Sequence, residues 1–170
     1  MPRPATGLRP DGVHAADRPL DYGPLNDRLG YALRLAQLAV FRDFFNAFAA
    51  FEIRPGQYSV LTIIQHNPGF TQTQVCDALR IQKANFVSVL DILVERGWVL
   101  RRPTPNDRRS YALFLTNNGK LLMRKLHRIA EQQEQRLIER LNAEDYQRVF
   151  ASLRTLAAMD DPPPGGDVNS

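Results

Sequence analysis

The sequence predicts a mostly α-helical fold that carries one small β-hairpin. Apolar residues recur at helical spacing along most of the chain between residues 26 and 158. The period changes only after Gly97, where two short runs of strand-forming residues flank a loop of turn residues. The expected order is therefore helix, helix, two short helices, hairpin, helix, helix. At 170 residues the chain fits one domain.

The two ends of the chain differ in composition from the segment between them. Residues 1–24 contain five Pro, three Gly and no sustained periodicity, and residues 160–170 begin with two Asp, three Pro and two Gly. Such segments bury little apolar surface, so we expect a flexible arm at 1–24 and a disordered tail at 160–170. The ordered domain is expected at 25–159. It should consist of a lobe at about 54–116 between terminal helices at about 26–51 and 117–159.

The first helix carries two apolar stripes. They contain Leu29, Leu33, Ala36, Val40, Phe44, Ala47 and Phe51 on one side, and Tyr31, Leu35, Leu38, Phe41, Phe45 and Phe48 on the other. At about 100° per residue the stripes lie roughly 145° apart. A helix with one side fully exposed to solvent needs only one apolar stripe. Two stripes predict two burial partners, such as the helix's own domain and a second subunit.

Turn and capping signals define the second and third helices. Pro55 suits the first turn of a helix that ends at Asn67-Pro68-Gly69. Thr71 and Gln74 have the spacing of a capping box, which predicts a short third helix ending near Leu79.

The fourth helix is expected from about Gln82 to Gly97, and its start lacks a strong signal, because Gln is a poor N-cap. The hairpin follows, and Asn117 or Asn118 is expected to cap the long fifth helix. A sixth helix then runs through Tyr146 and Leu156.

Most of the excess positive charge lies in the hairpin. The chain has a net charge of +4, and between Trp98 and Tyr111 four Arg stand against one acid, Asp107. A net positive charge is compatible with an anionic partner such as nucleic acid but does not require one.

Two short helices joined by a tight turn and followed by a basic hairpin form the pattern of a winged helix-turn-helix. The second helix of such a pair fits the major groove of double-stranded DNA, and its first residues reach base edges. Either feature alone also fits an ordinary solvated surface, but their order favours DNA binding. We expect base contacts from Gln82, Lys83, Ala84, Asn85 and Ser88. Arg108 and Arg109 are expected in the minor groove, and Arg101 and Arg102 at phosphates.

These residues resemble the MarR family of bacterial regulators over about residues 26–158. The family's hairpin pattern D-x-R-x-x-x-(V/L)-x-L-T-x-x-G appears as Asp107, Arg109, Leu113, Leu115, Thr116 and Gly119. Residues 90–101 and 55–61 match two further family patterns. The resemblance implies an obligate-type dimer through the N- and C-terminal helices that reads a pseudo-palindrome. It also implies that Arg109 enters the minor groove and is held by Asp107.

The resemblance further implies an effector, often aromatic or phenolic, bound between the dimer helices and the DNA-binding lobe. The matching residues are Arg34, Gln37, Phe41, Phe44, Phe45, Phe48 and Tyr58. Aromatic residues at this spacing are also typical of an ordinary core. Arg34 falls between the two stripes, where a buried guanidinium needs an acid of the protein or of the effector. The similarity favours a repressor of aromatic-compound catabolism that responds to aromatic acids or hydroxycinnamoyl-CoA thioesters.

The alternatives are a redox-sensing regulator that uses Cys76 and a protein-interaction module with the same fold. A single Cys excludes a disulfide within the chain. The three His lack ligand spacing, and no catalytic motif or cofactor motif is present, so we expect neither a metal nor an enzyme. No apolar run approaches the ~18 residues of a membrane span, and no export signal is seen. The chain is therefore expected in the bacterial cytoplasm, at the nucleoid.

Overall fold

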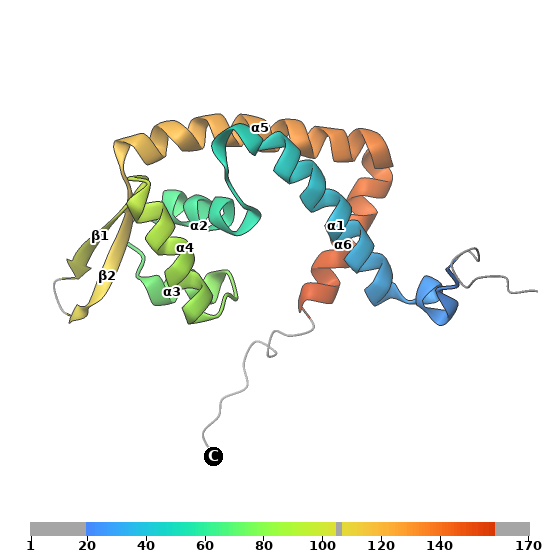
Figure 1. The fold of residues 1–170 in the computed structure, drawn as a ribbon, viewed down its shortest axis with the longest axis horizontal. Helices are drawn as coiled ribbons and strands as arrows, with labels where there is room; N and C mark the ends of the chain where they lie inside the picture. The colour runs from blue at the N-terminus through green and yellow to red at the C-terminus, as the bar shows by residue number, and fades with distance from the viewer. Residues whose placement is uncertain (1–19, 105–106, 159–170) are drawn as a thin grey trace, which may run out of the picture. The chain divides into compact units, whose positions relative to one another are not determined.

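The computed structural model describes residues 20–104 and 107–158, and for residues 107–109 it describes the backbone alone. Most of the predicted N-terminal arm and all of the predicted tail lie outside the described residues. In order, the elements are a 3-10 helix (Gly23–Asp27), α1 (Leu29–Ala47), a 3-10 turn (Ala49–Phe51), α2 (Pro55–His66), α3 (Gln72–Ala78), α4 (Lys83–Glu95), β1 (Val99–Thr104), β2 (Asp107–Leu115), α5 (Asn117–Leu141) and α6 (Ala143–Ala157) (Figure 1). This order confirms the predicted fold class.

The chain divides into two compact units, residues 1–39 and 40–170, with the boundary inside α1. The described part of the first unit holds the first 3-10 helix and the start of α1. There the rings of Tyr22 and Tyr31 lie 6.0 Å apart, and the side chains of Leu29, Leu35 and Leu38 are exposed. The second unit contains the remaining elements and the hydrophobic core.

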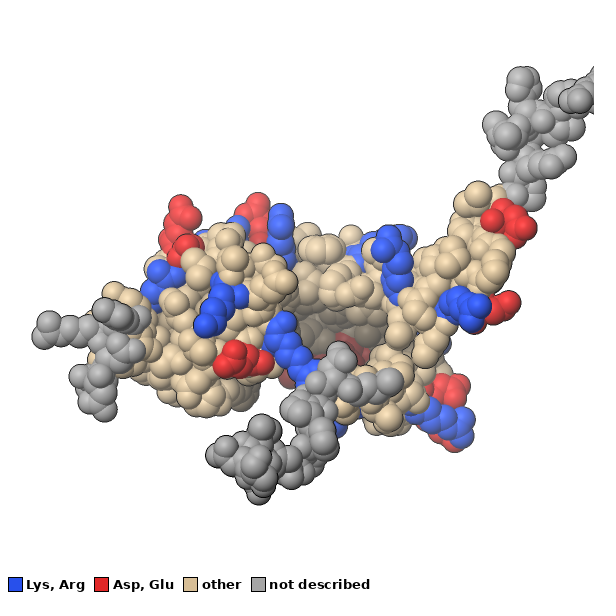
Figure 2. Space-filling view, turned by 90° about the horizontal axis from the view of Figure 1, so that it is seen from below, with Lys and Arg blue, Asp and Glu red and all other residues tan. Residues whose placement is uncertain are grey.

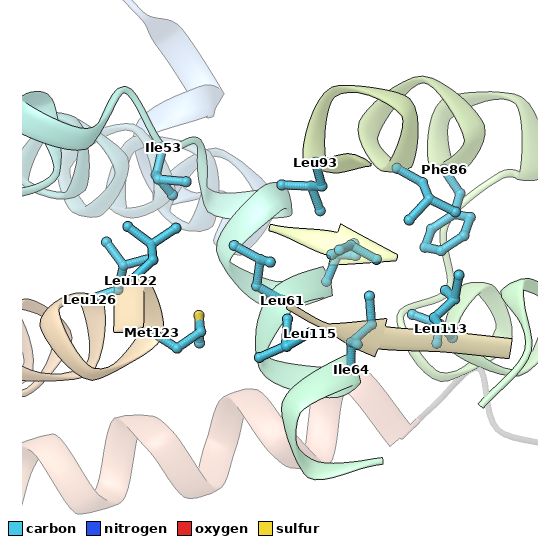
Figure 3. Close-up of a cluster of buried hydrophobic side chains, with 14 of the residues drawn as sticks. Ile53, Leu61, Ile64, Phe86, Leu93, Leu113, Leu115, Leu122, Met123 and Leu126 are labelled. Atoms are coloured by element: carbon cyan, nitrogen blue, oxygen red, sulfur yellow. The ribbon is translucent and has the colours of Figure 1, made fainter. Parts of the chain in front are cut away.

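The core of the second unit joins α2, α4, β2 and α5. Figure 3 shows their side chains pointing toward one another, with Leu61 of α2, Leu93 of α4 and Leu113 of β2 in one cluster. These three residues and Met123 and Leu126 of α5 are fully buried. Each such side chain contributes about 1.5–3 kcal/mol through removal of apolar surface from water. The core therefore holds both α4 and the hairpin against α2 and α5.

The capping box predicted for α3 is present. The Thr71 hydroxyl accepts a hydrogen bond from the Gln74 amide at 3.3 Å, and the Gln74 side chain accepts one from the Thr71 amide at 2.9 Å. The turn after α3 passes through Arg80, whose φ of +51° lies in the left-handed region. Gln82 is the N-cap of α4 and its side chain makes no capping hydrogen bond, as its residue type predicted.

The hairpin is held against the helix-turn-helix by backbone hydrogen bonds. β1 and β2 pair antiparallel from Val99 opposite Leu115 to Pro103 opposite Tyr111. The amide of Gly69 donates to the carbonyl of Leu113 at 2.9 Å, and the Leu113 amide donates to Phe70 at 2.9 Å. The loop between α2 and α3 thus pairs with β2 in the manner of a short third strand.

The N-cap of α5 is Thr116, so the expectation that Asn117 or Asn118 caps this helix was wrong. The Thr116 hydroxyl accepts from the Gly119 amide at 2.9 Å and donates to the Gly97 carbonyl at 2.7 Å. A Cβ at Gly119 would lie 2.1 Å from the carbonyl oxygen of Trp98, which no side chain can occupy. Thr116 and Gly119 of the T-x-x-G pattern therefore both allow the start of α5 to pack closely on Gly97 and Trp98, just before β1.

No helix among residues 20–104 and 107–158 combines the length and the apolar character that a membrane crossing requires.

Candidate nucleic-acid interface

The helix α4 has a buried face and an exposed face that begins at its N-terminus. Phe86, Leu90 and Leu93 are buried in the core. The five residues predicted to contact bases are all exposed, namely Gln82, Lys83, Ala84, Asn85 and Ser88. Exposed amide and ammonium groups at the start of a supported helix can reach base edges in a major groove.

Ser88 differs from the other four predicted contact residues. Its hydroxyl donates to the carbonyl of Ala84 at 3.3 Å, within the helix. It also lines a cavity on the side of α4 that faces the end of α1. Ser88 therefore lies where the exposed face of α4 meets the side of the helix that lines the cavity.

The buried Cys76 lies in α3, beside the turn that joins α3 to α4. Its thiol donates to the carbonyl of Ile81 at 2.8 Å and is 3% exposed. A buried thiol reacts slowly, because oxidation needs an accessible thiolate. The placement fits a packing role, and the redox hypothesis gains no support from it.

Two of the hairpin arginines are engaged within the protein. Arg101 forms an ion pair with Asp91, which ties the hairpin to α4. The guanidinium of Arg102 lies over the ring of Phe114 at 5.1 Å from its centroid, and Arg102 is exposed. The side chains of Asp107, Arg108 and Arg109 lie outside the described residues, so their roles at the minor groove stay predictions.

On the face seen in Figure 2, acidic side chains interrupt the positive charge. In the space-filling view, Lys and Arg side chains stand beside Asp and Glu side chains on the described surface (Figure 2). Affinity for DNA would then depend on a few well-placed cations more than on a broad basic field.

A cavity of about 770 Å³ lies between the end of α1, the turn Ala49–Phe51, the start of α2, and α4. This volume falls in the range of small-molecule sites, about 300–1,000 Å³. From the end of α1 and the start of α2 it is lined by Phe45, Phe48, Ala49, Ile53, Arg54 and Gln57, and from α4 by Ser88, Val89, Ile92 and Arg96. The helix α4 therefore forms one wall of the cavity.

Only two of the seven residues predicted for an effector pocket line this cavity, Phe45 and Phe48. Phe44 is buried behind them, with its ring stacked on that of Phe48 at 3.9 Å. The ring of Tyr58 lies 5.5 Å from that of Phe48 but does not line the cavity. Phe41 is exposed.

Arg34 and Gln37, the polar members of the predicted pocket, belong to the first unit, and both are exposed in the single chain.

The sequence did not indicate the α4 wall of the cavity. Val89 is half-buried and Ile92 is 39% exposed, and Ile92 lies off the core-facing stripe of its helix. An apolar residue on the polar side of an amphipathic helix is the one signal that was available.

Two arginines supply the positive charge of the cavity. Arg96 donates to the backbone carbonyls of Phe51 at 3.3 Å and Glu52 at 3.4 Å, and its guanidinium lies over the Trp98 ring at 5.0 Å. Arg54 is exposed at the N-cap of α2. Glu52 also lines the cavity and forms an ion pair with Arg96 at 3.3 Å, so an anionic group at the rim would compete with it for Arg96 and would meet Arg54 first.

Tyr58 belongs to a polar network behind the cavity. The network joins the Tyr58 hydroxyl to Nδ1 of His127 at 3.2 Å, and Nε2 of His127 to the side-chain oxygen of Gln65 at 2.9 Å. Burial, the largest cause, and the charge of Glu131 raise the pKa of Tyr58, while a hydrogen bond with Thr62 opposes them. Both imidazole nitrogens are thus engaged in linking α2 to α5.

No group of three His, Cys, Asp or Glu within the described ranges is arranged to hold a metal ion.

Comparison with known proteins gives a consistent result. The family model described as "MarR family" matches residues 52–110. The transcriptional regulatory protein for the hcr operon of Thauera aromatica is 30% identical over 146 residues, which are 85% of this chain and 88% of the relative. The multiple antibiotic resistance protein MarR of Escherichia coli K12 is 30% identical over 95 residues, covering 55% of this chain and 66% of that protein.

Solved structures of the repressor CouR are similar over most of the chain. The form bound to a 23-mer DNA duplex has a TM-score of 0.78 and 39% identity, and it covers 82% of this chain and 99% of CouR. The form bound to p-coumaroyl-CoA has a TM-score of 0.77 and 36% identity, with 82% and 98% coverage.

Proposed function

This chain belongs to the MarR family of transcriptional regulators, and from that premise we propose that it is a homodimeric repressor that binds a pseudo-palindromic operator. The observation that carries the proposal is the start of α4, where Gln82, Lys83, Ala84 and Asn85 are exposed on a helix whose other face is anchored in the core. The similarity to CouR bound to DNA supports it.

The dimer is supported by apolar side chains that the single chain leaves exposed. On α6, Val149, Phe150, Leu153 and Leu156 are 36–48% exposed and recur at helical spacing. On α1, Phe41 and Phe45 are 38% and 48% exposed. Patches of this kind typically mark an interface between proteins. A second copy of the chain would bury both sets and present two recognition helices to one DNA duplex.

The experiment that tests DNA reading is fluorescence anisotropy on duplex DNA from upstream of the chain's own gene. A scrambled duplex serves as competitor at about 150 mM salt. A specific regulator should bind with a Kd of about 10⁻⁸ M or tighter and resist competition. Equal binding to both duplexes at about 10⁻⁶ M would contradict sequence-specific reading of this site and favour the protein-interaction module.

We further propose that an aromatic acid, or its acyl-CoA thioester, binds in the 770 Å³ cavity beside α4 and releases the operator. The cavity combines the aromatic side chains of Phe45 and Phe48 with the cations of Arg54 and Arg96. An aromatic ring would pack on Phe45, which is 48% exposed, and a carboxylate or phosphate would pair with Arg54, since Arg96 already pairs with Glu52. CouR, a related repressor, binds p-coumaroyl-CoA.

Three residues of α4, Ser88, Val89 and Ile92, link ligand binding in the cavity to DNA binding. These residues line the cavity from the recognition helix itself, so a ligand that needs more room must move α4 or its neighbours. A displacement of about 1 Å at a helix that reads base edges is enough to break hydrogen bonds that require 2.7–3.2 Å. Adding p-coumaroyl-CoA or p-coumarate to the anisotropy assay tests this: release by one of them supports the proposal, and unchanged affinity with both rules out this effector class.

A further inference from the structure

A small hollow lies between α3 and the start of α4. Its volume is about 100 Å³. This is more than the roughly 10–15 Å³ that one water molecule needs and less than the roughly 300–1,000 Å³ of a small-molecule site. The hollow therefore has room for a group such as a methyl but not for an effector. Six residues line it, namely Gln72, Thr73 and Cys76 of α3 and Lys83, Phe86 and Val87 of α4.

The inner part of the hollow is apolar. Phe86 and Cys76 are both buried there. The Cys76 thiol donates its hydrogen to the carbonyl of Ile81 at 2.8 Å, so it leaves no unpaired donor in the hollow. A phosphate oxygen placed inside would lose its water without gaining a partner. An apolar group, in contrast, would be removed from water favourably.

The opening of the hollow combines an apolar wall with a cation. Lys83 and Val87 are four residues apart in α4, so they are neighbours on one side of the helix. Lys83 is exposed, and Val87 is 44% exposed. A single exposed valine needs no explanation by itself. A valine that forms the wall of an apolar hollow, beside an ammonium group, suits a ligand edge with an apolar group next to a hydrogen-bond acceptor.

Thymine presents such an edge in the major groove of DNA. Its 5-methyl group lies next to the O4 acceptor, whereas cytosine presents an amino donor and no methyl group. The ammonium group of Lys83 can donate to O4 but not to the amino group of cytosine. In a helix-turn-helix the second helix enters the major groove while the first crosses the DNA backbone. The space between α3 and the start of α4 is then close to base edges.

We propose that the hollow receives the 5-methyl group of a thymine in the operator, with Val87 as its outer wall and Lys83 donating to O4. The inference rests on the proposed DNA-binding function and adds Val87 as a specificity-determining residue. Burial of one methyl group corresponds to about fourfold in affinity. A dimer that places one thymine in each of its two hollows would gain about fifteenfold.

The test compares duplexes that differ only at the 5-position of thymine. DNA from upstream of the chain's own gene is amplified with dTTP, dUTP or 5-bromo-dUTP and titrated with the full-length protein by fluorescence anisotropy. Uracil keeps O4 but lacks the methyl group, so the uracil duplex should bind about fifteenfold more weakly than the thymine duplex. Bromine is close to a methyl group in size, so the bromouracil duplex should regain the lost affinity.

Val87→Ala connects the methyl effect to this hollow. Because Val87 is exposed, its truncation should leave the fold intact while it removes the wall beside the methyl group. We expect the ratio of the affinities for the thymine and uracil duplexes to fall to about threefold or less. Glu95→Ala, at the far end of α4, is the control and should keep the full ratio. An unchanged ratio in Val87→Ala would mean that the methyl groups act elsewhere or through the shape of the duplex, and would overturn the proposal.

The same titrations separate this inference from the proposed function. Tight, competition-resistant binding with equal affinity for the thymine and uracil duplexes would overturn the thymine site and leave the repressor function standing. Equal binding to the upstream duplex and a scrambled duplex would contradict sequence-specific reading itself, and the thymine site with it.

Discussion

The guanidinium of Arg96 donates two hydrogen bonds to Glu52, one to its backbone carbonyl at 3.4 Å and one to its carboxylate at 3.3 Å. Arg96 is the C-cap of α4, and Glu52 ends the turn that follows α1. Glu52 has a φ of +51°, in the left-handed region that non-glycine residues seldom adopt. This contact therefore holds a strained turn to the end of the recognition helix, at the edge of the cavity proposed for the effector.

Replacing Arg96 and Glu52 separately should have unequal effects on stability. Arg96→Gln removes the bonds to the carbonyls of Phe51 and Glu52 and the stacking on Trp98, and we expect the free energy of unfolding to fall by about 1–2 kcal/mol. Glu52→Gln removes only a solvent-exposed ion pair and should cost less than about 0.5 kcal/mol. Urea denaturation at one fixed protein concentration measures both. An equal loss in the two variants would mean that the ion pair, and not the carbonyl bonds, holds the turn.

Asn85 is expected to read a base. Its side chain is exposed near the start of α4, and an amide that makes two hydrogen bonds to adenine contributes about 1–3 kcal/mol of discrimination. Asn85→Ala should therefore weaken operator binding by that amount and leave binding to a scrambled duplex nearly unchanged. Glu95→Ala, at the far end of the same helix, is the control and should change neither. Equal losses of Asn85→Ala on both duplexes would show that the side chain contacts the backbone of DNA.

Arg109 is expected to contribute affinity without sequence preference. From its match to the family pattern we expect it in the minor groove, where each neutralised phosphate releases about one counterion. Arg109→Ala should weaken binding to every duplex and lower the slope of log Kd against log salt concentration by about one. Arg140→Ala, near the end of α5, is the control of equal charge. If Arg109→Ala leaves the slope unchanged, the hairpin makes no ionic contact with DNA.

Filling the cavity from the α4 side should abolish the response to the effector. Ile92 lines the cavity and is 39% exposed, so a larger side chain can enter the cavity without disturbing the core. For Ile92→Trp we expect operator affinity within about threefold of the unmodified protein, a change of less than about 0.7 kcal/mol, and no release by p-coumaroyl-CoA. Retained release would place the effector elsewhere.

Arg34→Ala tests the alternative position of the effector, at the polar residues of α1 that the sequence indicated. Loss of release in Arg34→Ala together with normal release in Ile92→Trp would move the pocket to the first half of α1. Loss of release in both variants would show that the response requires Arg34 as well as the cavity beside α4.

The order of the elements and several of their boundaries followed from local sequence signals, whereas α1 spans only Leu29–Ala47 of the helix expected at about 26–51. The Thr71–Gln74 capping box, the Gly97 helix end and the weak cap at Gln82 all act within four residues, and the structure confirms each. Local signals fail where the partner is distant. Thr116 caps α5 because its hydroxyl also reaches the carbonyl of Gly97, 19 residues away, and no short-range pattern distinguishes it from Asn117.

The effector cavity shows the same limit. The aromatic residues of α1 indicated where a pocket might be lined, and Phe45 and Phe48 do line one. Its other wall comes from α4, about forty residues later in the chain, and depends on how the core sets that helix against the turn after α1. A helical stripe shows which side of an element is apolar but not which cavity that side faces.

The exposed apolar stripe of α6 gives a prediction about assembly. Leu153 is 40% exposed and lies between Val149 and Leu156 on one side of the helix. If a second chain covers this stripe, Leu153→Asp buries a carboxylate without a partner, which costs about 3 kcal/mol or more. The dimer dissociation constant should then rise at least about a hundredfold, and light scattering with size-exclusion chromatography should detect monomers. Operator affinity should fall with it, because one subunit contacts only one half-site. Thr155→Asp, on the other side of α6, introduces the same charge and should leave the dimer intact. A dimeric Leu153→Asp would mean that α6 faces solvent in the assembly and that the subunits meet elsewhere.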